Sequence, residues 1–162
     1  MIKTVSILAA CLGAVLLAPA ASAQQILQNG AGACKSALPV FDGNIRNRPT
    51  AISNEGTANA FVSCSMEDTI NGESDIVGAW IHNNNADARE VTCTFVNGTP
   101  VEGAEYFPKT ANFGPGAGSY ILWTGAADNA GDNFGFLVNF SCSLPPGVEL
   151  RLVTRNVPAP AP

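Results

Sequence analysis

Apolar and polar residues alternate along much of this chain with a period of two, which is typical of β-strands. The clearest alternation covers residues 134–142, where one side of the chain holds Phe134, Phe136, Val138, Phe140 and Cys142. Residues 60–66 alternate in the same way, with Val62 and Cys64 on one face and Ser63 and Ser65 on the other. We therefore expect two strands, each with one buried face.

Further strands are predicted at 76–82, 89–96, 119–124 and 148–154, with weaker pairing at 101–107 and an irregular or edge segment at 40–49. Gly and Pro recur at short intervals, and Asn97-Gly98 predicts a type I′ hairpin turn. No window has an apolar stripe of helical period. The fold class predicted is all-β, an antiparallel sandwich of about 7–8 short strands, with the jelly roll as one form.

The two ends of the chain differ from its middle. Residues 1–23 have one charge, an apolar run and Ala21-Ser22-Ala23, which predicts a signal peptide and a secreted or periplasmic protein. A lipoprotein cleaved at Cys11 is the minor alternative. We expect a flexible lead-in at 24–33, one β-sandwich domain at 34–155 and a Pro/Ala-rich tail at 156–162.

Four cysteines follow the signal segment, namely Cys34, Cys64, Cys93 and Cys142. An even number in an exported chain predicts two disulfides, and three pairings are open. We favour Cys34–Cys64, which would link the N-terminal region to a strand, and Cys93–Cys142, whose flanking residues match. Loops of these lengths would stabilise the fold by roughly 3.5–4 kcal/mol each in the chain-entropy model.

The charge balance argues against nucleic acid as a partner. The full chain has a formal net charge of −5, and removal of the signal segment with Lys3 leaves seven basic and thirteen acidic residues. The basic residues form no cluster that would neutralise phosphates or an anionic membrane surface. Beyond the signal segment, no stretch is long and apolar enough to predict a transmembrane helix.

Candidates for catalysis are few. His82 is the only histidine, and it falls at the end of a predicted strand, where an edge or surface position is the simpler interpretation. Three groups of carboxylates are possible acid–base pairs, but all lie beside predicted turns: Glu67 with Asp68, Glu73 with Asp75, and Glu102 with Glu105. We therefore expect no enzyme and no cofactor.

Two other groups of residues suggest binding. Residues 128–133 are rich in oxygen ligands, so calcium, if bound, would be held by Asp128 and Asp132, although a polar loop explains the same residues. Trp80 and Trp123 lie in apolar strands and are expected in the core, whereas Tyr106-Phe107 is the better candidate for an exposed aromatic contact. Two glycosylation sequons, at Asn97 and Asn139, are taken as chance matches because the signal is bacterial in type.

The cysteine settings carry a resemblance. Cys34, Val62-Ser63-Cys64, Val91-Thr92-Cys93-Thr94 and the run from Cys142 to Gly147 resemble uncharacterised small secreted two-disulfide β-sandwich proteins of Gram-negative bacteria. The resemblance covers about residues 34–154, on motifs that are structural. Ser65 stands where relatives often have Pro. It implies a β-sandwich and no known activity.

These observations favour a secreted or periplasmic, non-enzymatic protein with a structural, binding or surface role. The alternative is a carbohydrate-binding module, with calcium as a possible aid, and a glycan or protein is the partner expected. A small hydrolase or lyase using loop carboxylates is a third hypothesis. Fold alone does not distinguish them.

Overall fold

The computed structural model describes residues 24–66, 73–99, 101, 103–135 and 137–157. The signal peptide predicted at 1–23, with Cys11, lies outside the described residues, as do residues 158–162 and the acidic residues Glu67, Asp68 and Glu102. In the described part of the chain, no helix is long and apolar enough to cross a membrane.

The described residues form eleven strands, two single-turn α-helices and one 3-10 helix. The strands are β1 (Gln24–Asn29), β2 (Cys34–Ser36), β3 (Ile45–Arg48), β4 (Ala51–Asn54), β5 (Ala60–Ser65), β6 (Ile76–Asn83), β7 (Arg89–Thr99), β8 (Gly103–Phe113), β9 (Gly118–Thr124), β10 (Val138–Leu144) and β11 (Val148–Val157). The helices are α1 (Gly30–Ala33), η1 (Pro39–Phe41) and α2 (Gly125–Asp128).

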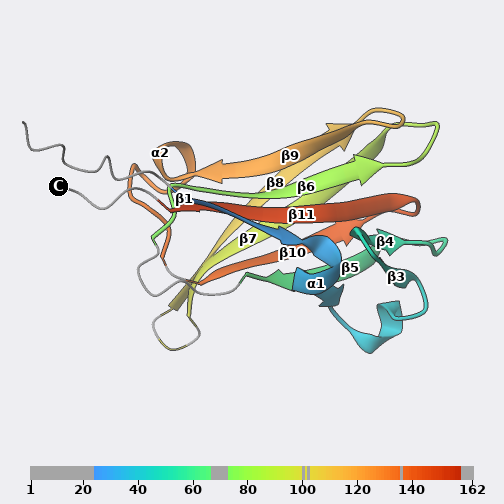
Figure 1. Cartoon of the computed structure of the whole chain (residues 1–162), viewed down its shortest axis with the longest axis horizontal. Helices are drawn as coiled ribbons and strands as arrows, with labels where there is room; N and C mark the ends of the chain where they lie inside the picture. Colours follow the sequence, from blue (N-terminus) through green and yellow to red (C-terminus); the bar gives the residue numbers. More distant parts are fainter. Residues whose placement is uncertain (1–23, 67–72, 100, 102, 136, 158–162) are drawn as a thin grey trace, which may run out of the picture.

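The strands form two antiparallel sheets packed face to face. Sheet A has the order β3-β4-β11-β6-β9, with β1 paired to the second half of β11, and sheet B has the order β2-β5-β10-β7-β8. Figure 1 shows β6, β9 and β11 side by side in one layer. The four-strand orders β4-β11-β6-β9 and β5-β10-β7-β8 are those of a jelly roll, which confirms the predicted all-β sandwich.

The N-terminal segment is ordered, so the expectation of a flexible lead-in at 24–33 is wrong. Gln24 pairs with Val157 and Asn29 with Leu152, which makes the segment a strand of sheet A. Along β11, β4 pairs only with Glu149 and Leu150, so the rest of this edge of β11 is open to another strand. Backbone hydrogen bonds to that edge need no apolar alternation, and for this reason the sequence pattern does not reveal β1. The same pairing places Asn156 and Val157 in β11 and outside the tail.

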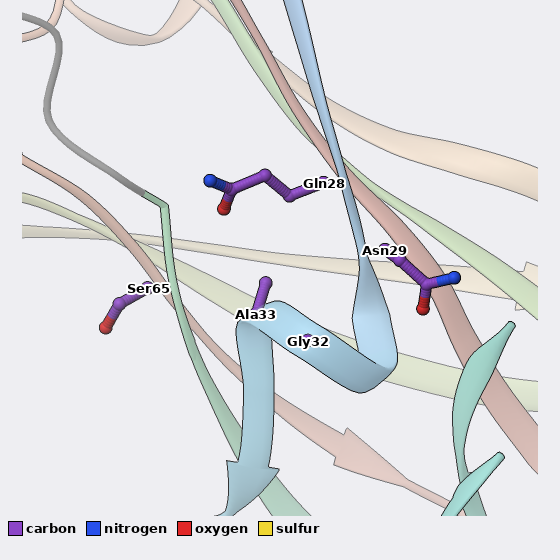
Figure 2. A pocket seen from close by; sticks show the side chains of 5 residues that line it. All are labelled: Gln28, Asn29, Gly32, Ala33 and Ser65. Carbon is purple, nitrogen blue, oxygen red and sulfur yellow. The ribbon is translucent and has the colours of Figure 1, made fainter. Parts of the chain in front are cut away.

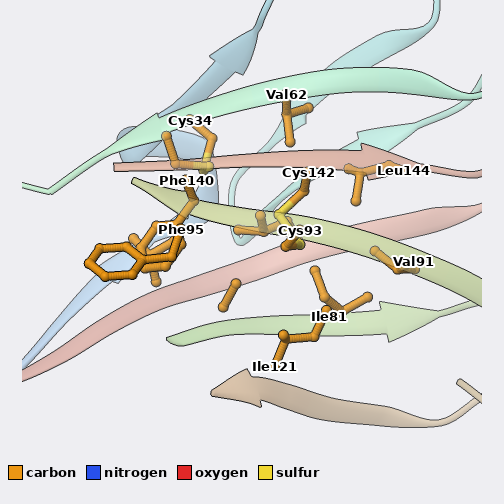
Figure 3. Close-up of a cluster of buried hydrophobic side chains, with 14 of the residues drawn as sticks. Cys34, Val62, Ile81, Val91, Cys93, Phe95, Ile121, Phe140, Cys142 and Leu144 are labelled. Atoms are coloured by element: carbon orange, nitrogen blue, oxygen red, sulfur yellow. A yellow bond between two sulfur atoms is a disulfide. The ribbon is translucent and has the colours of Figure 1, made fainter. Parts of the chain in front are cut away.

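The core lies between the sheets and is rich in aromatic side chains (Figure 3). Phe95 from sheet B contacts the rings of Phe134 at 4.8 Å and Phe140 at 5.7 Å, and it meets Trp123 from sheet A at 5.9 Å. Each of these side chains is at most 1% exposed. The cluster holds the two sheets in register, since burying each large aromatic side chain is worth roughly 2–3 kcal/mol.

Both predicted disulfides are confirmed, and both lie in sheet B. Cys34 of β2 is directly opposite Cys64 of β5, with Cα atoms 3.9 Å apart. Cys93 of β7 is directly opposite Cys142 of β10, at 4.0 Å. All four side chains point to the core and are at most 5% exposed. Four of the five strands of sheet B are therefore joined in two covalent pairs, which lie side by side through β5 and β10.

One edge of the sandwich is closed by side chains that reach between the sheets. Trp123 Nε1 of β9 donates to the Phe107 carbonyl of β8 at 2.8 Å. In return, Lys109 Nζ of β8 donates to the Leu122 carbonyl of β9, also at 2.8 Å. These bonds satisfy backbone carbonyls that would otherwise be free at the edges of both sheets.

The turn predicted at Asn97-Gly98 is wrong. Both residues belong to β7, where they pair with Glu105 and Ala104 of β8. Gly98 has φ of 90°, a left-handed backbone conformation that glycine adopts readily in turns. Here this conformation occurs inside the long pairing of β7 with β8. The Asn97 side chain accepts a hydrogen bond from the Gly135 backbone at 2.7 Å, which ties β7 to the segment before β10.

Candidate functional site

The outward side of sheet B is lined mainly by small polar side chains. Because alternate residues of each strand face the core, the intervening ones face outward. We call this surface the hydroxyl face and define it by Lys35, Phe61, Ser63, Ser65, Thr92, Thr94, Val96, Tyr106, Pro108, Thr110, Asn139, Ser141 and Ser143.

These side chains stand in register across the strands. One row runs from Lys35 through Ser63 and Ser141 to Thr94. The next runs from Ser65 through Asn139 and Val96 to Tyr106. A third runs from Phe61 through Ser143 and Thr92 to Thr110, and the two threonine hydroxyls are 2.8 Å apart. Tyr106 is 67% exposed, so its ring stands open at the β8 side.

A groove borders the hydroxyl face where β1 turns through α1 into β2. It consists of two adjoining hollows that share Gly32, Ala33 and Ser65. The first has a volume of about 320 Å³ and is also lined by Gln28 and Asn29. The second, of about 310 Å³, is also lined by Cys34, Lys35 and Ser63. We call the two hollows together the α1 groove.

Local sequence chemistry shapes the α1 groove. The Asn29 side chain accepts a hydrogen bond from Ala31 N at 2.8 Å and caps α1, so it points away from Gln28 (Figure 2). Figure 2 shows the Gln28 side chain extending from β1 towards Ser65. Gly30 lies against β11, where a Cβ atom would collide with the Leu150 carbonyl. The small residues of α1 thus allow the chain to cross closely between the two sheets and leave polar groups at the groove.

The outward side of sheet A is different, because its side chains are apolar and two of them are aromatic. We call it the aromatic face and define it by Leu27, Trp80, Tyr120, Leu122 and Leu152. Trp80 and Tyr120 are opposite each other on β6 and β9, with ring centroids 4.7 Å apart at an interplanar angle of 82°. Leu27 is 51% exposed and Leu122 43% exposed. Trp123 is in the core as predicted, whereas the core position expected for Trp80 is wrong.

His82 lies on the same outward side of sheet A, near the end of β6. Its cross-strand neighbours are Glu149 of β11 and Gly118 of β9. The Glu149 carboxylate accepts from Arg151 Nε at 2.9 Å, and His82 Nδ1 is buried without a hydrogen bond to any described residue. A histidine base in a catalytic triad needs a nucleophile on one nitrogen and an orienting acceptor on the other. The described residues supply neither to His82.

The candidate carboxylate pairs do not form a site in the described residues. Glu73 is exposed and accepts from Asn133 Nδ2 at 3.3 Å, while Asp75 is half-buried nearby in sequence. Glu105 is also exposed and accepts from Asn97 Nδ2 at 3.3 Å. None of these three carboxylates lines the α1 groove. Hydrolysis by these loop carboxylates stays a hypothesis, because none of the three lies in that groove.

Asp128 has a structural role in the described residues. Its Oδ2 atom accepts from Lys109 Nζ and from Thr124 N, each at 2.8 Å. Burial by itself would raise the pKa of Asp128, but the hydrogen bonds from Lys109 and Thr124 and the lysine charge together hold it below 3.8. Asp132 is exposed, and its backbone carbonyl accepts from Asn129.

The described residues contain no group of three His, Cys, Asp or Glu side chains able to hold a metal ion. Calcium binding by Asp128 and Asp132 stays a prediction. At the Oδ2 atom of Asp128, an ion would compete with the hydrogen bonds from Lys109 and Thr124.

Sequence reasoning placed Ser63, Ser65 and the exposed Tyr106 correctly but did not bring them together. The alternation assigns a side chain to one face of its own strand, whereas the rows depend on which strands are neighbours and in what register. Gln28 and Lys35 were missed as groove residues because no motif marks the crossing of β1 into β2. The only local signal is the run Asn29-Gly30-Ala31-Gly32, whose small residues permit a close turn.

Comparison with known proteins gives distant likeness only. The chain matches no family model and no curated protein sequence. It is similar to an exo-β-1,3-galactanase from Phanerochaete chrysosporium, with a TM-score of 0.44 and 14% identity. That match covers 82% of this chain, which spans only 29% of the galactanase.

Two carbohydrate-binding modules are also similar in structure. The module TmCBM61, solved with β-1,4-galactotriose, has a TM-score of 0.37 and 10% identity, and the match covers 80% of this chain and 86% of the module. The module CBM28, specific for non-crystalline cellulose, has a TM-score of 0.39 and 13% identity over 72% of this chain and 79% of the module. At these scores the likeness assigns no function to this chain.

Proposed function

We propose that this chain is an exported, non-enzymatic protein that binds a glycan on the hydroxyl face of sheet B. The observation that carries the proposal is the set of polar side chains in register across sheet B, which lies between the α1 groove on one side and the exposed ring of Tyr106 on the other. A binding surface of this kind combines a hollow, hydrogen-bonding groups and an aromatic contact.

The chemistry of the face suits a sugar. Each sugar hydroxyl both donates and accepts, and so do the hydroxyls of Ser63, Ser141 and Thr94 and the amide of Asn139. The apolar faces of sugar rings pack on aromatic rings, and Tyr106 is the most exposed aromatic side chain of the described residues. Hydrogen bonds would then set the orientation while the aromatic ring provides apolar contact.

The dimensions favour a chain of sugars over a single one. Neighbouring strands are about 4.8 Å apart, so the five strands of sheet B span roughly 19 Å. A linear oligosaccharide lying across the strands would contact the groove at one end and Tyr106 at the other. A monosaccharide would contact only one of these two.

The two disulfides also support this proposal. They lie on the core side of sheet B, beneath the hydroxyl face. Each one fixes the spacing of two adjacent strands whose outward side chains form the rows. A surface that is already in its binding geometry loses less conformational entropy when a ligand binds. The disulfides and the predicted signal peptide together favour an oxidising compartment, either periplasmic or extracellular.

Binding of neutral oligosaccharides by residues 24–162 tests the proposal. A glycan array would identify a ligand, and calorimetry with cellotetraose, laminaritetraose and galactotetraose would measure affinity. We expect binding to at least one linear glycan, and we expect Tyr106→Ala to weaken it by about tenfold or more. Tyr120→Ala, on the aromatic face, is the matched control and should leave the affinity unchanged.

The same assay addresses calcium and catalysis. We expect the affinity to be equal with and without a chelator, because Asp128 is already engaged by Lys109. We also expect the recovered glycan to be intact after long incubation. Failure of every glycan to bind, or equal loss in the Tyr106 and Tyr120 variants, would contradict the proposed function.

A further inference from the structure

A third hollow lies at the sheet edge beside the α1 groove. It has a volume of about 330 Å³ and is lined by Lys35, Ser36, Asp42, Ile45, Arg46 and Asn47. Lys35 lines this hollow and also the second hollow of the α1 groove, so the two spaces meet at its side chain. We call the third space the edge hollow.

The edge hollow gathers basic side chains that lack acidic partners. Elsewhere in the described residues, Arg48 is paired with Glu55, Lys109 with Asp128 and Arg151 with Glu149, while Arg89 stands apart from the hollow and forms no ion pair among them. Arg155 is buried and engaged with another group. Lys35 and Arg46 form no ion pair within the described part of the chain.

Arg46 is held in place by the backbone. Its Nη1 atom donates to the carbonyl oxygens of Asp42 at 3.0 Å and Ile45 at 2.9 Å. Its Nε and Nη2 atoms make no hydrogen bond to any described residue, so one side of the guanidinium remains available to a ligand. A planar guanidinium with two free donors matches the geometry of a carboxylate or a sulfate.

Asp42 is the single acidic residue of the edge hollow, whose lining therefore holds two cations and one carboxylate. The chain as a whole is acidic, with a formal net charge of −5. A highly charged polyanion would be repelled by the molecule at large, whereas a ligand with one anionic group would be oriented by this local positive charge. The charge therefore distinguishes one end of the hydroxyl face from the other.

We propose that the edge hollow binds the anionic group of an acidic oligosaccharide, whose neutral part lies along the row from Lys35 to Thr94. This inference rests on the proposed function and narrows its ligand to glycans with a carboxylate or sulfate near one end. Lys35 contacts both parts of the ligand, and Arg46 pairs with the anion. Ser63 and Ser141 follow Lys35 in register and contact the sugars next to it.

Matched ligands test the inference. The probes are a tetrasaccharide that ends in one glucuronic acid, its carboxyl-reduced neutral form, and the same tetrasaccharide with a terminal sulfate. Calorimetry at low salt should show the acidic forms binding roughly tenfold more tightly than the reduced form, because two partly exposed charged contacts are added. The preference should shrink in high salt, where exposed charge pairs are screened.

Single-residue variants test whether the preference for acidic glycans comes from the edge hollow. Lys35→Gln and Arg46→Gln should each reduce the preference for the acidic forms by roughly threefold. Arg46→Gln should leave the affinity for the neutral form within about twofold, whereas Lys35→Gln should also weaken the neutral form, because Lys35 contacts the neutral sugars as well. Lys35→Arg should retain the preference. Arg48→Gln is the matched control from the same strand as Arg46, since Arg48 is paired with Glu55 and does not line the hollow.

The outcomes separate the inference from the proposed function. If acidic and reduced forms bind equally in wild type, or if Arg48→Gln has the same effect as Arg46→Gln, the inference is wrong although glycan binding stands. If inorganic sulfate alone binds as tightly as the acidic tetrasaccharide, the hollow is a simple anion site and the inference is also wrong. If Tyr106→Ala has no effect on any probe, the proposed function itself fails.

Discussion

The hydroxyl face and the aromatic face lie on opposite sides of one sandwich, and they differ in both chemistry and support. Sheet B presents Ser, Thr and Asn side chains over two disulfides, whereas sheet A presents Trp80, Tyr120 and leucines and has no disulfide among its described strands. Both faces follow from the same alternation of inward and outward residues. The inward positions of both sheets therefore form the common core, and the outward positions give each face its own chemistry.

The difference shows why exposure of an aromatic residue is insufficient to locate a glycan site. Trp80 and Tyr120 pack edge to face against each other, which uses part of their apolar surface within the protein. Tyr106 contacts no other ring among the described residues and stands at the end of the row that runs from Ser65 through Asn139 and Val96. A sugar needs hydrogen-bonding groups next to the ring, and only the hydroxyl face supplies them in rows.

The largest expected effect concerns the covalent support of sheet B. Replacement of Cys93 and Cys142 by alanine should lower the free energy of unfolding by roughly 4 kcal/mol, because the bond closes a long loop between adjacent central strands. Urea denaturation would measure this. Hydrogen exchange should show the amides of β7 and β10 losing protection more than those of β6 and β9. A decrease in the free energy of unfolding of less than about 1 kcal/mol would show that the disulfide adds little to the stability of sheet B. An equal loss of amide protection in both sheets would show that it does not stabilise sheet B more than sheet A.

A smaller effect concerns the edge where the two sheets meet. Asp128→Asn should cost about 1 kcal/mol at pH 7, because Lys109 then loses a partly buried ion pair between β8 and α2, the helix that follows β9. The folded-state pKa of Asp128 is lowered below 3.8, so its stabilising contribution is present above that pH and is lost as the pH falls through the folded-state value.

Thermal unfolding from pH 7 down to pH 2 would test this prediction. The stability of wild type should approach that of the Asn variant only in the acidic part of the range. Arg48→Gln removes a more exposed ion pair, with Glu55, and serves as the control with a smaller effect. A constant difference between wild type and Asp128→Asn across the range would contradict the assignment.

Much of sheet B could be predicted from sequence because its strands alternate strongly. The positions of Cys64, Cys93 and Cys142 on inward faces and of Ser63 and Ser65 on outward ones follow directly from the pattern. The confirmed disulfide pairs required more than the pattern, since three pairings were open. Their choice rested on matching settings around Cys93 and Cys142 and on the place of Cys34 before the first strand.

Other features depend on tertiary context that local sequence does not encode. β1 forms because β11 is longer than its neighbour β4, and nothing within residues 24–29 records that length. Trp80 sits in an apolar segment like Trp123, yet the register of sheet A turns it outward. The two unpaired cations at the edge hollow, Lys35 and Arg46, come together only because β2 and β3 lie at the same edge.

The proposed function depends most on which face binds the glycan. A ¹H–¹⁵N correlation titration of residues 24–162 with the tetrasaccharide that ends in glucuronic acid would locate it directly. We predict shift changes at Lys35, Ser63, Ser141, Asn139 and Tyr106, with the indole and backbone signals of Trp80 unchanged. Shift changes centred on Trp80 and Tyr120, with the hydroxyl face silent, would contradict the central claim.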